Sequence, residues 1–173
     1  MDDEWLPFEI HPDTPEKGVL WKDYFPGMNP IAFWRQLNAR AFPMGLKFGP
    51  QELMSNSSKA MQAGEFAKQH GRYEAFHDAV FKAFFTDCKD IGDTKVILDI
   101  AERAELDTEQ LERELAAGTY KTVLDETTLA AKKNMISSAP TFVIEGYGTV
   151  TGAEPIENFR KILNKLAQKQ KHT

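Results

Sequence analysis

The sequence predicts a mixed α/β fold in which a long helical stretch separates one strand near the N-terminus from a β-hairpin and a helix near the C-terminus. Leu6, Phe8 and Ile10 recur at every second position, the period of a half-buried strand. Helical periodicity then dominates for about a hundred residues. Residues 141–145 form an apolar run of strand-forming residues, and a glycine-containing turn and a second such run follow.

The first strand is expected over residues 5–10. Pro7 cannot donate a ladder hydrogen bond, so we place this strand at a sheet edge. Residues 11–26 are rich in proline, glycine and aspartate, which break both periodicities. We therefore expect an irregular connection before the first helix.

Six helices are expected in the helical stretch, most of them starting at a capping residue. The expected starts are Asn29 with Pro30, Ser55 or Ser57, about Tyr73, Asp93, Asp107 and a point after Gly118, and the last of these helices ends near Asn134. In the third helix, apolar residues share one stripe: Phe76, Val80, Phe81 and Phe84. This stripe predicts the core of a helical subdomain.

The C-terminal part has a hairpin pattern followed by a helix. Residues 146–148 form the turn and residues 149–151 the second strand. Pro155 opens a last helix whose apolar residues, from Ile156 to Leu166, recur at helical spacing. We expect this helix to cover the sheet.

Composition excludes several classes of function. The net charge of −5 and the lack of any long basic block argue against nucleic acid as a partner. No apolar stretch approaches the ~18 residues of a membrane span, so no membrane partner is expected. The acidic start has no apolar segment after it, which predicts a cytoplasmic protein. The histidines lack metal-site spacing, and neither a metal nor a cofactor is expected.

Several segments together carry a resemblance to a known family. These are residues 4–12, 56–57, 76–81, 90–93, 140–144 and 152–155. In this order and spacing the chain resembles the cytoplasmic, FrnE-like branch of the DsbA family from about residue 4 to residue 168. The resemblance implies a thioredoxin-like part (residues 1–26 and 135–173), an all-helical insertion (residues 27–134), and thiol–disulfide exchange as the family's activity.

The chain departs from this family at its start. Family members have a strand and a helix bearing Cys-x-x-Cys before the segment that here begins at Met1, so we expect an incomplete thioredoxin-like fold. The strand in question would lie between residues 5–10 and residues 141–145. A start further upstream, a rearranged sheet or another subunit could fill this gap. If the chain is complete, we expect a homo-oligomer, such as a dimer, formed through the exposed sheet edge.

The chemistry of disulfide exchange requires a thiolate of lowered pKa and a second thiol beside it. The chain has one cysteine, Cys88, which follows a predicted helix C-terminus and has Asp87 and Asp90 nearby. We therefore predict no catalytic residue and interpret Cys88 as an ordinary thiol. The alternative is a reactive thiol that forms mixed disulfides.

The resemblance assigns a substrate loop to Ala139, Pro140 and Thr141. It implies that the Ala139–Pro140 bond is cis, whereas an ordinary X-Pro bond in a folded protein is trans. The partner implied is a protein or peptide thiol substrate. His77, on an amphipathic helix, is expected to pack rather than to catalyse.

Three functions remain open at this stage. The first is a DsbA-type oxidoreductase that is truncated or redox-inactive alone. The second is a non-catalytic peptide-binding or self-associating scaffold. The third is a relative of chromene-carboxylate isomerases and kappa glutathione transferases. The last group is related to the first, because it shares the fold, but it uses a serine or cysteine on the segment that is missing here.

Overall fold

The structure, a computed structural model, describes residues 3–170, without the side chains of residues 169 and 170. The chain divides into two compact units, Met1–Thr127 and Thr128–Thr173. Helices predominate over short strands, and the predicted mixed α/β class with a helical insertion is confirmed. The assignment of residues 1–26 to the same domain as residues 135–173 stays a prediction.

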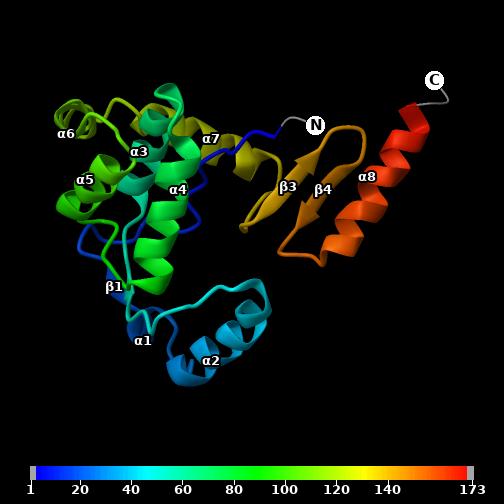
Figure 1. The fold of residues 1–173 in the computed structure, drawn as a ribbon, viewed down its shortest axis with the longest axis horizontal. Helices are drawn as coiled ribbons and strands as arrows, with labels where there is room; N and C mark the ends of the chain where they lie inside the picture. Colours follow the sequence, from blue (N-terminus) through cyan, green and yellow to red (C-terminus); the bar gives the residue numbers. More distant parts are fainter. Residues whose placement is uncertain (1–2, 171–173) are drawn as a thin grey trace. The chain divides into compact units, whose positions relative to one another are not determined.

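The elements of the described residues are shown in Figure 1. In chain order they are β1 (Val19–Leu20), α1 (Trp21–Tyr24), α2 (Pro30–Ala41), the 3₁₀ turn η1 (Phe42–Met44), β2 (Leu53–Met54), α3 (Ser58–Gln69), α4 (Tyr73–Phe81), the π-helical turn η2 (Lys82–Thr86), α5 (Thr94–Arg103), α6 (Thr108–Ala117), α7 (Lys121–Lys133), β3 (Thr141–Ile144), β4 (Gly148–Thr151) and α8 (Ile156–Gln170).

The core of the first unit lies between α3, α4, α5 and α6, with α3 and α4 side by side in Figure 1. Its largest fully buried side chains are Phe66, Phe76, Ile97, Leu111 and Leu124. The amphipathic patterns of these helices place their apolar residues inward, and burial of each such side chain contributes about 1.5–3 kcal/mol.

Three helix starts are fixed by the side chains that the sequence predicted. Asn29 Oδ1 accepts from the Ala32 amide at 3.0 Å, and Asp93 Oδ1 accepts from the Lys95 amide at 2.9 Å. Asp107 Oδ1 accepts from the Gln110 amide, also at 2.9 Å. Each bond satisfies an amide that has no partner inside its own helix.

The third predicted helix differs from its regular pattern at its end. Phe76 and Val80 are buried as expected, but Phe81 is half exposed. The helix changes from α to π at Lys82, which alters the angular spacing of the residues that follow. Phe84 packs on the core as expected. Phe81 precedes the π turn and lies about 100° around the helix from Val80, away from the core, and its ring meets that of Phe85, with ring centroids 5.6 Å apart.

The strand predicted over residues 5–10 is wrong. The segment has no strand structure, and Leu6 is 62% exposed, so the alternation does not define a buried face. A strand needs a neighbour in a hydrogen-bonded ladder, and the ladders of the described residues are β1–β2 and β3–β4. The segment is instead attached by Trp5, whose ring packs on His77 and whose carbonyl accepts from Lys68 Nζ.

The second unit contains the predicted hairpin and last helix. β3 pairs antiparallel with β4, with Thr141 opposite Thr151 and Ile144 opposite Gly148. α8 packs on one face of the hairpin, where the Phe142 and Phe159 ring centroids are 4.8 Å apart. The unit thus presents one helix-covered face and one face bearing Val143, which is 71% exposed.

Candidate functional site

The loop formed by residues 139–141 leads directly into β3. The Ala139–Pro140 bond is cis, as the resemblance implied. The Pro140 carbonyl accepts from the Gly152 amide at 2.8 Å, and Thr141 Oγ1 donates to the Ser138 carbonyl at 2.7 Å. Because bonds form on both sides of the proline, the loop is held against the hairpin, while Ala139 and Pro140 stay exposed.

The outer edge of β3 carries unused backbone groups. In an antiparallel ladder every second residue of a strand bonds to the neighbouring strand. Because Pro140 bonds to Gly152, Phe142 and Ile144 are the residues that bond to β4. Thr141 and Val143 therefore direct their amides and carbonyls outward. Within the described residues, the backbone of Ala139 also makes no hydrogen bond. This edge can accept an extended chain as a further strand.

Cys88 lies in the first unit, just after η2, whereas the 139–141 loop lies in the second. Its backbone has a left-handed φ of 55°, and its thiol is 3.9 Å from the Thr86 carbonyl oxygen. Burial raises the pKa of the Cys88 thiol, and the charges of Asp87 and Glu52 raise it further. This environment is opposite to that of a reactive cysteine.

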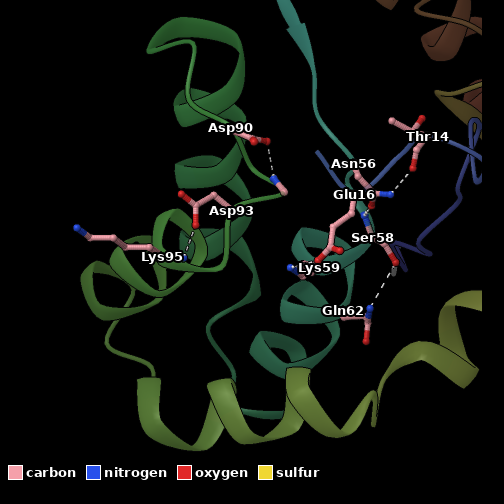
Figure 2. Close-up of polar contacts among 10 residues, drawn as sticks. Thr14, Glu16, Asn56, Ser58, Lys59, Gln62, Asp90, Asp93 and Lys95 are labelled. Atoms are coloured by element: carbon pink, nitrogen blue, oxygen red, sulfur yellow. Dashed lines mark hydrogen bonds and ion pairs between the residues drawn. The ribbon is translucent and has the colours of Figure 1, made fainter. Parts of the chain in front are cut away.

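A polar cleft of about 580 Å³ lies in the first unit. It is lined by Pro15, Glu16, Lys17, Lys59, Asp90, Gly92, Asp93 and Thr94. Figure 2 shows Lys59 and Glu16 meeting across it, with Nζ and Oε1 2.9 Å apart. The hydrogen bond and charge of Lys59 lower the pKa of Glu16, which favours the carboxylate form that pairs with Lys59.

Asn56 joins the segments that border this cleft. Its Nδ2 donates to the Thr14 carbonyl at 2.6 Å, and its Oδ1 accepts from the Ser58 amide at 3.0 Å (Figure 2). The side-chain cap expected from a serine is wrong here. Ser57 stands at the N-cap position of α3, but its backbone is already helical, with φ −86° and ψ 0°, and its side chain makes no cap bond. Asn56 Oδ1 bonds the first amide of α3 instead.

Gly92 lies where three segments converge closely. A Cβ atom on Gly92 would lie 3.0 Å from the Asn56 carbonyl oxygen, 3.2 Å from Asp90 Oδ1 and 3.4 Å from the Glu16 carbonyl oxygen. The motifs at residues 56–57 and 90–93 therefore fix the connections around the cleft. Sequence reasoning identified these motifs but missed Glu16, Lys17 and Lys59, since nothing in the sequence indicates that these positions meet.

Other candidate groups have structural roles. His77 packs between aromatic rings, as predicted, with its ring centroid 4.3 Å from that of Phe81 and 4.9 Å from that of Trp5. In the part of the chain that the structure describes, no three His, Cys, Asp or Glu side chains are grouped to hold a metal ion. None of the helices described there is long and apolar enough to cross a membrane.

The similarity to known proteins extends over both units. A profile of the family described as DSBA-like thioredoxin domain matches residues 4–164. The uncharacterized protein YwbO of Bacillus subtilis (strain 168) is 27% identical over 183 aligned residues, which cover 96% of this chain and 83% of YwbO. The crystal structure of a probable DsbA oxidoreductase from Streptomyces coelicolor aligns with a TM-score of 0.81 at 26% identity, covering 91% of this chain and 72% of that chain.

Proposed function

Because the chain belongs to the DsbA-like thioredoxin domain family, we propose that it binds an extended protein or peptide segment at residues 139–141 and does not carry out disulfide exchange by itself. The FrnE-like branch and the cytoplasmic location remain part of this proposal.

The single cysteine supports the redox part of the proposal. Exchange through a mixed disulfide needs an attacking thiolate and a second thiol to release the product. The sequence provides only Cys88, whose pKa burial raises, so neither requirement is met by the 173 residues. A protein thiol of another chain would have to supply the chemistry.

The proposal that the chain binds an extended segment depends on the outward backbone groups of β3. An extended segment laid along Thr141 and Val143 would receive main-chain hydrogen bonds without disturbing β4. The exposed Val143 side chain would contact alternate side chains of that segment. Residues 139–141 would set where the segment enters.

Binding is tested by anisotropy with a fluorescein-labelled, alkylated insulin B chain. Val143→Pro removes an outward amide but no bond to β4, and proline is tolerated at such an edge. We expect this variant to lose binding and the matched Val143→Thr variant, which keeps the amide, to retain it. Equal binding by both variants would contradict the assignment of the edge.

The redox part has a separate assay. We expect the purified chain not to accelerate the reduction of insulin by dithiothreitol. Acceleration that disappears in Cys88→Ser would instead make Cys88 the reactive thiol.

The same free edge favours self-association as a second candidate function. Two copies could pair β3 to β3 in a continuous sheet, forming a homo-oligomer. Sedimentation velocity distinguishes the two uses, because self-association through this edge is concentration-dependent and disappears in Val143→Pro.

A further inference from the structure

Helix α2 has buried apolar side chains on one side and exposed apolar side chains beside them. Its inner side buries Trp34 and Ala41, and Trp34 Nε1 donates to the Gln51 carbonyl at 3.2 Å. On its outer side, Ile31 is 80% exposed and Phe42, the first residue after it, is 82% exposed. An exposed apolar patch on a folded protein is typical of an interaction surface. Figure 1 shows α2 lying apart from α3 to α6 of the same unit.

The exposed apolar residues continue beyond the helix. Met44 is 68% exposed and Leu46 is 57% exposed, on a loop that turns at Gly45 with φ 71°. The loop returns to the helix through Asn38, which donates to the Phe48 carbonyl at 2.9 Å and accepts from its amide at 2.8 Å. We call the exposed side of residues 31–47 the basic arm surface.

The charges of this surface are all positive. From residue 24 to residue 51 the sequence has no Asp or Glu, and its charged residues are Arg35, Arg40 and Lys47. The whole chain, in contrast, has a net charge of −5. Within the part of the chain that the structure describes, none of these three cations has a carboxylate partner.

We propose that the basic arm surface binds another protein through an acidic segment of that protein with apolar side chains. The interaction is independent of residues 139–141 and of any thiol. Its composition is that of interface cores, in which Phe, Met and Arg are enriched and Asp and Glu are depleted. An acidic segment would supply carboxylates to the three unpaired cations and apolar groups to Ile31 and Phe42.

Two other occupants fit the observations less well. In a symmetric contact between two copies, the same cations would face one another without any anion in the contact. On a lipid surface, cations are expected at the border of an apolar patch. Arg35 instead lies four residues after Ile31 and seven before Phe42, on the same side of the helix, where a carboxylate can bind its guanidinium in a bidentate manner.

The test uses three cysteine-free, fluorescein-labelled peptides of about 16 residues, each able to form an amphipathic helix. They share one leucine pattern and differ by having Glu, Gln or Lys at the other positions. We expect the Glu peptide to bind at least about tenfold more tightly than the Gln peptide, the Lys peptide not to bind, and raising NaCl from about 50 to about 500 mM to weaken the Glu complex.

Variants locate the binding on the arm. The double variant Phe42→Ser with Met44→Ser, and separately Arg35→Gln, should each reduce affinity for the Glu peptide at least about fivefold. All these side chains are exposed, so the fold is kept, which circular dichroism checks. Leu129→Ser and Arg103→Gln, which change exposed residues outside the arm, are the matched controls and should bind as the unchanged chain does.

Four results would overturn the proposal. These are equal binding of the three peptides, no binding of the Glu peptide at about 1 mM, Phe42-dependent binding to phosphatidylcholine vesicles containing phosphatidylserine, and self-association in sedimentation velocity that the Phe42 and Met44 double variant abolishes. The third result would assign the surface to a membrane and the fourth to a second copy. Because the peptides contain no thiol and Val143→Pro leaves the arm unchanged, failure here is distinguishable from failure of the edge proposal.

Discussion

Replacing Asn56 by alanine should destabilise the first unit through two separate bonds. The side chain connects residues far apart in the chain, since its Nδ2 donates to the Thr14 carbonyl and its Oδ1 accepts from the Ser58 amide. Thr14 is buried, so water does not readily replace the lost donor. The substitution therefore affects both the start of α3 and the attachment of the segment around Glu16.

The expected loss follows from these two bonds. Removing a side-chain acceptor at a helix start costs about 1 kcal/mol, and leaving a buried carbonyl without its donor costs about 1–3 kcal/mol. We expect Asn56→Ala to lower the free energy of unfolding by about 2–4 kcal/mol. Asn56→Ser keeps a side-chain acceptor at the helix start but loses the donor to Thr14, so it should lose only the second part.

Urea unfolding followed by tryptophan fluorescence measures this loss. All three tryptophans, Trp5, Trp21 and Trp34, belong to the first unit, so the signal reports its unfolding. Gln36→Ala, at an exposed residue of the same unit, is the control and should change stability by less than about 0.5 kcal/mol. A similarly small loss for Asn56→Ala, or equal losses for the alanine and serine variants, would refute the two-bond reasoning.

Three further predictions concern the core and the thiol. Phe66→Ala, at a fully buried ring, should cost about 3–5 kcal/mol in urea unfolding, and a loss under about 1 kcal/mol would show that the site is not tightly packed. Gly49→Ala would place a Cβ 2.5 Å from both Cys88 Sγ and the Thr86 carbonyl oxygen, so its melting temperature should fall by an amount corresponding to about 1–3 kcal/mol; an unchanged temperature would contradict this packing. Burial raises the pKa of Cys88, which lowers the thiolate fraction at neutral pH, so iodoacetamide should label it more slowly than free cysteine, with the rate rising at higher pH than for the free thiol; faster labelling at pH 7 would refute the assignment.

Local signals in the sequence predicted much of the helical part. Asn29, Asp93 and Asp107 cap helices as predicted because a cap depends on a side chain and an amide two or three residues away. The apolar run before the turn and the stripe after Pro155 likewise predicted β3 and α8. These patterns are contained within one element, so one sequence is sufficient to read them.

Features that depend on distant partners were not predictable in this way. Residues 5–10 alternate like a strand, but Trp5 packs on His77 instead of entering a ladder. β1 and β2 have two residues each, and their pairing joins Val19 to Met54 without any periodic signal. The polar cleft was not predictable either, because Glu16 and Lys59 are far apart in the sequence and meet only in the folded unit.

The π-helical turn η2, which follows α4, binds the segment that leaves the basic arm surface. In η2 the carbonyls of Phe84 and Phe85 accept from Gln51 Nε2 at 3.1 Å and from the Gly49 amide at 2.7 Å, and Thr86 Oγ1 donates to the Lys47 carbonyl at 2.8 Å. The segment that leaves the arm is thus fixed before any partner arrives. A partner would meet a preorganised surface and lose little conformational entropy in ordering it, so its affinity would depend mainly on the contacts made.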